Sequence, residues 1–311
     1  MTTERAIVVG VDGGGTKTRL VVADGAGHIL TSVSGGPSGI GNGDVEAAAD
    51  TIAALTGDAL AAAGLHDVTP SVLCAGVAGA GRDDPRAALR RALRSREVAD
   101  DVVVTSDAMV ALTDAFGDSA GVLLIAGTGS VAFGRSPTGV VDRCGGWGAN
   151  LGDEGSALWL ARRALSAATA AADGREPDTA LLGALLTAAQ CDEPDDLIAW
   201  SAVADPAALA ALAPVVLRAA ENGDKRANTI VAIAAEELVL HVRTLARRLF
   251  GDERAAIPFA MAGGLLTRGT LVRKLVEHRL KSAVPGAVAH HDEIDPARGA
   301  VKLARRGVGV I

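Results

Sequence analysis

Residues 7 to 24 read IVVGVDGGGTKTRLVVAD, two β-rich runs separated by an aspartate, three glycines and a Thr-Lys-Thr triplet. Glycines let backbone N–H groups converge on an anion, and the triplet adds hydroxyl and ammonium donors. The second run is apolar and β-branched, whereas a Walker loop or a dinucleotide-binding loop opens a helix. The pattern therefore predicts a phosphate-binding β-hairpin, with donors from Gly13, Gly14, Gly15, Thr16, Lys17 and Thr18.

Asp12 directly precedes the glycines and is the candidate metal residue. A carboxylate at this place suits Mg²⁺, which usually keeps several of its waters when it binds. The alternative is an ordinary glycine-rich turn that binds nothing. Three glycines exceed what a two-residue hairpin needs, so the flanking acid and base favour nucleotide binding.

The composition predicts a globular α/β protein of about two domains, with 311 residues, 49% hydrophobic and 22% charged. A net charge of −7 argues against a nucleic-acid or anionic-membrane surface. Cys74, Cys144 and Cys191 lack the spacing of a metal site or a disulfide framework, which favours a reducing compartment. The N-terminal residues have no signal-peptide pattern, and no run of about 18 apolar residues lacks charges. We expect a cytoplasmic protein without a membrane partner.

The opening pattern returns at Gly121, where VLLIAGTGSVAFGR again predicts a strand, a glycine-threonine turn and a strand. Two halves with the same opening indicate an internal repeat. The second turn adds candidate phosphate donors, and between about 156 and 250 alanine and leucine at helical spacing predict a helical insertion. A strand-to-helix junction near the C-terminus has a glycine pair that permits close approach of a base or ribose. These candidates are Gly127, Thr128, Gly129 and Ser130 in the turn and Gly263 and Gly264 in the pair.

Two aspartates follow predicted strands or open predicted helices. Asp107 comes after VVVTS, at the strand end where open α/β sheets place ligands, and could take the proton of an acceptor hydroxyl in phosphoryl transfer. Asp153 opens a helix with Glu154 in its first turn. An aspartate at such a junction is also a good helix cap, so the residues alone leave both interpretations open.

These motifs resemble the actin-like ATPase superfamily over nearly the whole chain, and within it the N-acetylglucosamine kinase branch of the BadF/BadG/BcrA/BcrD ATPase family. The resemblance rests on VDGGGTKTRL (11–20), TSDAMVAL (105–112), IAGTGSVAFG (125–134), GGWGANLGDEGSALWLA (145–161) and AGGLL (262–266). It implies two ribonuclease H-like domains with a helical insertion in the second. The implied limits are 1–115 plus 296–311 for the first domain and 116–295 for the second.

By resemblance, the protein is an ATP-dependent, Mg²⁺-using kinase for the 6-hydroxyl of an amino sugar, with N-acetylglucosamine as the expected substrate. Asp107 is then the general base and a substrate contact, Asp153 binds a sugar hydroxyl, and Thr128, Gly145 and Gly146 contact the ring or its 2-substituent. Glucosamine, N-acetylmuramic acid or another hexose stays open as substrate. An ATP-driven conformational switch without a small acceptor is the alternative of another class, and a homodimer is left open.

The sequence also departs from relatives. It lacks the His and Cys cluster that binds zinc in ROK sugar kinases and the cysteine motif of the iron–sulfur dehydratase activators. Many relatives read Gly-Pro-Ser-Asn near the sugar, but here Gly39 follows Gly36-Pro37-Ser38. The asparagine contact is then missing or has moved to Asn42. Trp147 could stack on the sugar or serve as packing.

Overall fold

The computed structural model describes residues 6–41, 43–252, 254–290 and 292–308. The chain forms two compact units: unit 1 runs to Ser119 and resumes at Asp292, and unit 2 runs from Ala120 to His291. The domain limits predicted from the sequence lie a few residues from these boundaries. No helix in the described ranges combines the length and the apolar character needed to cross a bilayer.

Unit 1 is built on a five-stranded sheet with the strand order β3-β2-β1-β4-β5. Its strands are β1 (Ile7–Gly13), β2 (Thr18–Asp24), β3 (Ile29–Gly35), β4 (Val72–Val77) and β5 (Asp101–Thr105). The first three form the predicted antiparallel meander, and β4 and β5 extend the sheet parallel to β1. This arrangement puts the carboxyl ends of β1, β4 and β5 at one edge of the sheet.

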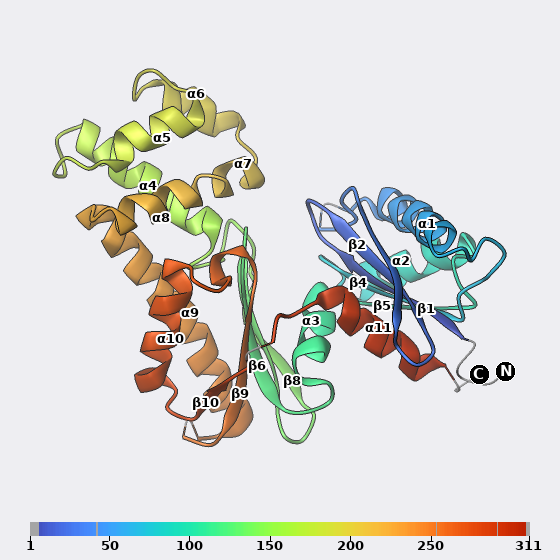
Figure 1. The fold of residues 1–311 in the computed structure, drawn as a ribbon. Helices are drawn as coiled ribbons and strands as arrows, with labels where there is room; N and C mark the ends of the chain where they lie inside the picture. The colour runs from blue at the N-terminus through green and yellow to red at the C-terminus, as the bar shows by residue number, and fades with distance from the viewer. Residues whose placement is uncertain (1–5, 42, 253, 291, 309–311) are drawn as a thin grey trace. The chain divides into compact units, whose positions relative to one another are not determined.

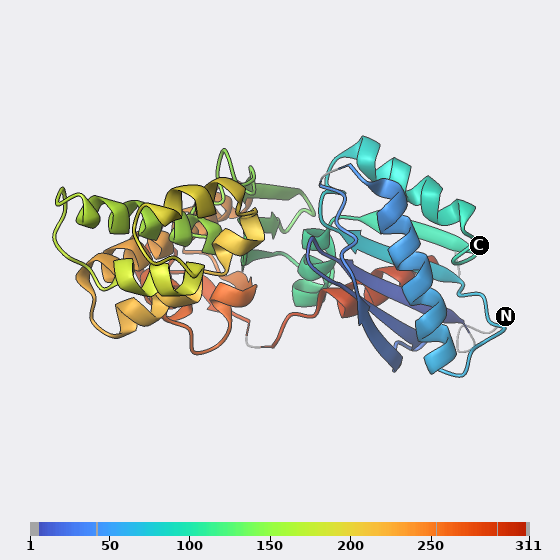
Figure 2. The same cartoon turned by 90° about the horizontal axis from the view of Figure 1, so that it is seen from above.

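Helices cover both faces of this sheet (Figures 1 and 2). One face packs against α1 (Val45–Ala62) and α2 (Asp83–Ser95), and the other against α3 (Asp107–Phe116) and α11 (Pro296–Gly307). Successive residues of β1 enter opposite layers, as the two-residue period of a strand requires. Because α11 comes from the end of the chain, unit 1 is assembled from two distant segments.

The helices α3 and α11 cross in close contact. A Cβ atom on Gly299 of α11 would lie 1.9 Å from the carbonyl oxygen of Val110, so only glycine permits this approach. Beside the crossing, the buried carboxylate of Asp114 accepts hydrogen bonds from Arg298 Nε and Nη2 (2.8 and 2.6 Å) and from Lys302 Nζ (2.8 Å). Burial alone would raise the pKa of Asp114, but these hydrogen bonds hold it below its usual value. A buried ionic cluster therefore joins the two helices.

Unit 2 repeats the same sheet topology with the strand order β10-β9-β6-β7-β8. Its strands are β6 (Gly121–Ala126), β7 (Ser130–Arg135), β8 (Val141–Gly145), β9 (Ile257–Ala262) and β10 (Ala287–Ala289). The antiparallel β6-β7-β8 meander corresponds to β1-β2-β3, and β9 and β10 are parallel to β6. The internal repeat predicted from the sequence is thus present in the strand pairing.

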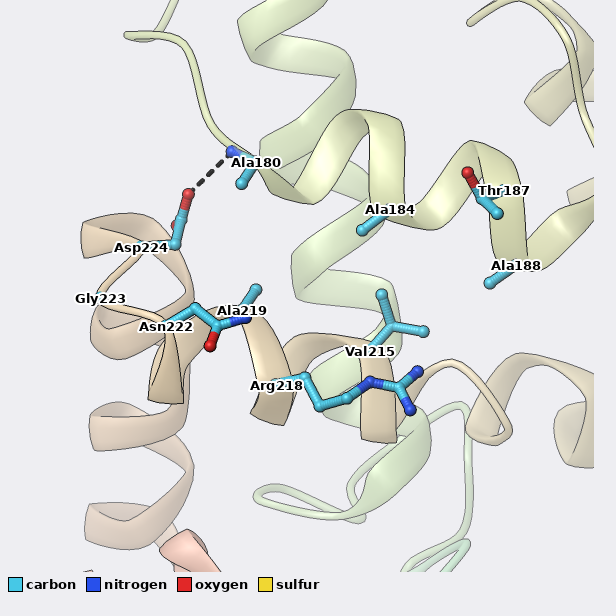
Figure 3. A pocket seen from close by; sticks show the side chains of 10 residues that line it. All are labelled: Ala180, Ala184, Thr187, Ala188, Val215, Arg218, Ala219, Asn222, Gly223 and Asp224. Carbon is cyan, nitrogen blue, oxygen red and sulfur yellow. Dashed lines mark hydrogen bonds between the residues drawn. The ribbon is translucent and has the colours of Figure 1, made fainter.

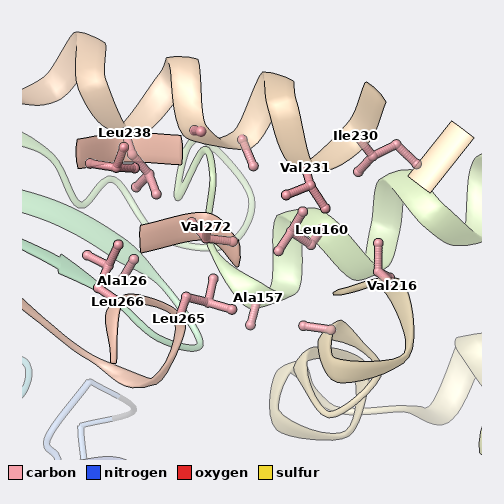
Figure 4. Packing of buried hydrophobic residues seen from close by; sticks show 14 of the residues in the cluster. Ala126, Ala157, Leu160, Val216, Ile230, Val231, Leu238, Leu265, Leu266 and Val272 are labelled. Carbon is pink, nitrogen blue, oxygen red and sulfur yellow. The ribbon is translucent and has the colours of Figure 1, made fainter. Parts of the chain in front are cut away.

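Most of unit 2 between its two strand groups is helical. The elements are α4 (Ala157–Ala172), α5 (Leu181–Ala189), α6 (Asp196–Val203), α7 (Pro206–Ala210), α8 (Ala213–Glu221) and α9 (Lys225–Phe250), and after β9 come η2 (Gly264–Leu266) and α10 (Leu271–Ala283). Leucine, valine and alanine side chains from these helices and from β6 form one continuous core (Figure 4). The long α9 also packs on β6, β7 and β8, so it supports the sheet as α1 does in unit 1.

Candidate active site

The turn between β1 and β2 is closed by backbone hydrogen bonds. Gly14 N donates to Lys17 O (3.0 Å), and Gly14 O accepts from the amides of Ser38 and Gly39 (3.1 and 2.9 Å). Of the predicted phosphate-binding residues, Gly15, Thr16 and Lys17 are exposed, so their donors are accessible to a ligand. Thr18 is buried, and its hydroxyl donates to Ser38 Oγ (2.7 Å). Its side chain therefore supports the turn from inside.

Asp107 lies at the junction between β5 and α3, as the sequence predicts: β5 ends at Thr105, and Asp107 is the first residue of α3. The N-cap of α3 is Ser106, whose hydroxyl accepts the amide of Met109 (3.2 Å). Capping therefore does not account for Asp107. Burial raises the pKa of its carboxyl, and the backbone amides of Asp107 and Ala108 counteract this in part. A carboxylate with a raised pKa is a stronger proton acceptor.

Asp12 lies at the end of β1, in a group of carboxylates from three segments of unit 1. Burial raises its pKa from 3.8 to about 6, and the negative charges of Asp107 and Asp295 add to the increase. The cations Lys17 and Arg19 counteract it. Asp295 is fixed in place, since it pairs with Arg19 at 2.8 Å and caps α11. The end of β1 thus carries more negative charge than the local cations compensate.

This arrangement fits a magnesium ion. An excess of carboxylate charge is what a divalent cation would neutralise, and oxygen is the ligand that Mg²⁺ prefers. Within the described residues, however, no three His, Cys, Asp or Glu side chains are grouped as direct metal ligands. Asp12 would therefore hold the ion together with water and phosphate oxygens, as the sequence predicts.

In unit 2, the β6–β7 turn lies against the start of α4. Gly127 N donates to Gly129 O (2.9 Å), and Gly127 O accepts the amide of Ala157 (2.9 Å). The hydroxyl of Ser130, a predicted phosphate donor, is buried and donates its proton to Glu154 O (2.6 Å), so it holds the loop that carries Asp153 instead.

Asp153 directly faces that turn. A Cβ atom on Gly129 would lie 2.8 Å from Asp153 Oδ2, so a side chain there would displace the Asp153 carboxylate. The N-cap of α4 is Ser156, which accepts the amide of Trp159 (3.2 Å), and capping therefore does not explain Asp153 either. Its backbone has φ +59°, a left-handed conformation uncommon outside glycine and typical of functional sites. Burial raises its pKa, although amides of Ser130 and Gly148 lower it in part.

Gly145 and Gly146 end β8 and turn toward the same loop, since Gly146 N donates to Ser130 O (3.0 Å). Trp147 follows with 65% of its surface exposed, so it is not the core packing residue that the sequence left as an alternative. The guanidinium of Arg143 lies 4.8 Å from the centre of the Trp147 ring. The aromatic residue therefore stands on the surface beside the predicted sugar contacts.

One residue of this region was missed by reasoning from the sequence. His241 projects from the buried face of α9, and its Nε2 lies 3.8 Å from Glu154 Oε2. A Cβ atom on Gly145 would be 2.9 Å from the same nitrogen, so the imidazole supports both the glycine turn and the acidic loop. The only available signal was a lone histidine among leucine and valine at helical spacing, which is typical of an ordinary core position.

The glycine pair lies after β9, at the same edge of the sheet as the β6–β7 turn. Gly263 has φ +94°, and a Cβ atom there would lie 2.3 Å from the oxygen of Ala126, so its role is close backbone packing. Gly264 has open space around it. Unit 2 thus brings together Gly127 to Ser130, Gly145, Gly146, Asp153 and Gly264, while Asn42, the other predicted sugar contact, falls outside the described residues.

Unit 1 has a cavity of about 380 Å³ beside the phosphate turn, lined by Gly15, Ser38, Gly39 and Asp44 among others. Gly39 does not present its hydrogen atom to open space. A Cβ atom there would lie 3.2 Å from the backbone of Gly14 and Gly15, which is closer than an ordinary contact. An asparagine at this position would therefore press on the phosphate turn.

A separate cavity of about 680 Å³ lies between α5 and α8 of unit 2 (Figure 3). Four of its ten lining residues are alanine, and its carboxylate, Asp224, caps α9 and accepts the amide of Ala180 (2.8 Å). None of the predicted site residues lines it. Despite its size we assign the chemistry to the glycine turns, because the aspartates whose pKa is raised by burial, Asp12, Asp107 and Asp153, lie beside them, whereas the pKa of Asp224 is lowered.

Comparison with known proteins shows the family of the chain. Residues 9–304 match the model of the BadF/BadG/BcrA/BcrD ATPase family. An N-acetylmuramic acid/N-acetylglucosamine kinase of Clostridium acetobutylicum is 30% identical over 300 residues, which cover 96% of this chain and 98% of that protein. An N-acetyl-D-glucosamine kinase of Dictyostelium discoideum is 29% identical over 316 residues, with coverage of 96% and 98%.

Solved structures show the same fold. A protein from Chromobacterium violaceum, described as a candidate N-acetylglucosamine kinase, has a TM-score of 0.81 and 29% identity, covering 97% of this chain and 99% of its own. A ROK family glucokinase from Streptomyces griseus, solved with glucose and AMPPNP, has a TM-score of 0.59 at 20% identity, covering 97% and 100%. The second likeness is one of fold alone, and it supports the expected actin-like ATPase architecture.

Proposed function

This chain belongs to the BadF/BadG/BcrA/BcrD ATPase family, and from that premise we propose that it is an ATP-dependent kinase for the 6-hydroxyl of an amino sugar. N-acetylglucosamine is the expected acceptor, because two relatives of about 30% identity over nearly full length carry that sugar in their names. The Clostridium relative is also named for N-acetylmuramic acid, which therefore stays a candidate substrate. A cytoplasmic location, where ATP is available, is part of the proposal.

The observation that carries the proposal is the position of Asp107, at the end of β5 and free of a capping role. We assign it as the general base. As the sugar oxygen forms its bond to the γ-phosphorus, the hydroxyl proton passes to the Asp107 carboxylate, and the bond from that phosphorus to the β,γ-bridging oxygen breaks. The raised pKa of Asp107 favours this proton transfer.

The rest of unit 1 binds the nucleotide phosphates in this proposal. The amide of Gly15 and the side chains of Thr16 and Lys17 would donate to phosphate oxygens, in a turn closed by the hydrogen bond from Gly14 N to Lys17 O. A magnesium ion at Asp12 would neutralise charge on the transferred phosphoryl group. Arg19 keeps Asp295 paired at 2.8 Å, so this second carboxylate stays fixed near the ion site.

The loops of unit 2 bind the sugar in this proposal. Asp153 would accept a hydrogen bond from a sugar hydroxyl, and the backbone of Thr128, Gly145 and Gly146 would contact the ring or its 2-substituent. The exposed Trp147 is available to stack on an apolar sugar face. Ser130 and His241 would hold this loop in shape, since both contact Glu154 next to Asp153.

The test is ADP release with ATP, Mg²⁺ and a panel of amino sugars. A kinase forms ADP only when its sugar is present, whereas a conformational switch hydrolyses ATP at a rate that ignores the sugar. Asp107→Asn keeps the size of the side chain but cannot take the proton, so turnover should fall by about two to four orders of magnitude. Asp84→Asn, an exposed carboxylate on α2, is the matched control and should leave turnover unchanged. Near-normal turnover of Asp107→Asn would remove the base assignment.

A further inference from the structure

Arg143 holds a fixed position beside the predicted sugar contacts. It lies on β8, two residues before Gly145, and its Nη1 donates to the carbonyl oxygens of Gly145 (3.0 Å) and Gly146 (2.8 Å). The guanidinium also lies over the Trp147 ring, 4.8 Å from its centre, at the distance of a cation–π contact. Two carbonyls and an aromatic face therefore orient a side chain that is otherwise exposed.

The positive charge of this guanidinium is not compensated by a carboxylate. In the part of the chain that the structure describes, no Asp or Glu forms an ion pair with Arg143. The adjacent Asp142 pairs instead with Arg248 at 2.6 Å, and Glu154 faces His241 at 3.8 Å. The carbonyl bonds use Nη1 alone, so Nε and Nη2 keep their donors for another group.

A free guanidinium edge in a fixed orientation is suited to a carboxylate. The planar fork matches the two carboxylate oxygens, and its prior ordering reduces the entropy lost on binding. The protein as a whole has a net charge of −7, and Asp12, Asp107 and Asp295 concentrate negative charge in the proposed catalytic region. An acidic sugar would be repelled by these charges, so recognising one requires a dedicated cation of this kind.

We propose that Arg143 binds a carboxylate carried by the sugar, and that the substrate class extends to amino sugars with an acidic substituent, such as the 3-O-lactyl ether of N-acetylmuramic acid. This inference rests on the proposed kinase function, because that function places Gly145 and Gly146 at the sugar. The competing explanation is that Arg143 only fastens the Gly145–Gly146 turn through its two carbonyl bonds. That role would serve neutral and acidic sugars equally.

The experiment compares kcat/KM for N-acetylmuramic acid and N-acetylglucosamine in the wild type, in Arg143→Gln and in Arg143→Lys. Loss of a charge-assisted bidentate pair should lower kcat/KM for N-acetylmuramic acid about 10- to 100-fold, while N-acetylglucosamine changes by less than about threefold. Arg143→Lys should recover part of the loss, because it restores the charge without the fork. Arg163→Gln is the matched control, since Arg163 lies over Trp159 on α4 (5.0 Å) in the same unit.

The outcomes distinguish failure of the inference on Arg143 from failure of the proposed kinase function. Equal losses for both sugars in Arg143→Gln would mean a fastening role and would overturn the inference. A wild type that phosphorylates N-acetylglucosamine but neither binds nor phosphorylates N-acetylmuramic acid would overturn it as well, with the kinase function intact. Absence of activity on every amino sugar would instead reject the proposed function. Titration calorimetry with N-acetylmuramic acid, with no nucleotide present, gives a readout that does not depend on turnover.

Discussion

Replacing Asp12 by Asn should make the protein more stable at neutral pH when no ligand is present. The Asp12 carboxylate is half-buried among negative charges, and its pKa is raised from 3.8 to about 6. Above pH 6 the folded state must keep this charge against burial and against Asp107 and Asp295. Asn has nearly the same shape without the charge, so the variant escapes that penalty.

The size of the effect follows from the two pKa values. The gap between 3.8 in the unfolded chain and about 6 in the folded one corresponds to about 3 kcal/mol at pH 7.5. As the pH falls, the folded state takes up a proton that the unfolded state does not yet bind, so the wild type gains stability. About half of the difference should remain at pH 5, and little of it near pH 4. Solvent screening makes these values upper limits, and the attraction to Lys17 and Arg19 is already included in the pKa of about 6.

The assay is chemical denaturation of both proteins at pH 7.5 and pH 5 without Mg²⁺ or nucleotide. Far-UV circular dichroism is the suitable probe, because Trp147, Trp159 and Trp200 all lie in unit 2 and do not report on Asp12. Asp24→Asn is the control. Asp24 is partly exposed, and its hydrogen bonds with His28 lower its pKa, so its loss should not stabilise the protein at any pH.

With magnesium and nucleotide bound, the stability difference between the wild type and Asp12→Asn should shift in favour of the wild type. If Asp12 holds the ion, Mg²⁺ with a non-hydrolysable nucleotide should stabilise the wild type and have little added effect on Asp12→Asn, which should also lose turnover. The reasoning is refuted if Asp12→Asn is no more stable than the wild type at pH 7.5, or if the difference between them does not depend on pH.

Three further substitutions test other parts of the structure. Asp114→Asn should destabilise unit 1 by about 1 to 3 kcal/mol in denaturation followed by circular dichroism, because Arg298 and Lys302 lose their buried partner; both cations are about 40% exposed, which limits the loss. A change below about 0.5 kcal/mol would contradict the proposed link between α3 and α11. His241→Gln should reduce acid sensitivity: burial lowers the pKa of His241, so below about pH 6.5 the unfolded chain binds a proton that the folded one resists. Between pH 7.5 and 5.5 the wild-type melting midpoint, followed by tryptophan fluorescence, should fall more than that of the variant. Gly39→Asn should raise the KM for ATP, since its Cβ would press on Gly14 and Gly15; a lower KM for the sugar with ATP use unchanged would show that this loop serves the sugar instead.

The sequence predicted the sheets well because their signals are local. Alternating β-branched runs around glycine turns define both meanders, and the restart at Gly121 indicated the repeat that the strand pairing contains. The helical segments between about 156 and 250 also had clear spacing. The local sequence could not predict that α9 packs on the second sheet. A buried helix face has the same hydrophobic pattern whether it packs on a sheet or on other helices.

The site was harder to predict for an equally physical reason. Ser106 and Asp107 are neighbours and both residue types cap helices well, so only the fold could show that Ser106 is the cap. Asp114 had no local signal, because its cationic partners lie more than 180 residues later in the chain. His241 and Glu154 are likewise far apart in sequence. Interactions between distant segments decide these roles.

The position of α11 has a consequence for synthesis of the protein. Unit 2 is one continuous stretch of chain, but the face of the first sheet that carries Val8, Val21 and Val72 is only partly covered by α3 until residues 296–307 arrive. A ribosome extends the chain from its N-terminus, and domains usually fold in that order. Here we expect the order to be reversed. Unit 2 can fold first, and unit 1 keeps part of one apolar sheet face exposed until α11 has been synthesised and packs on it.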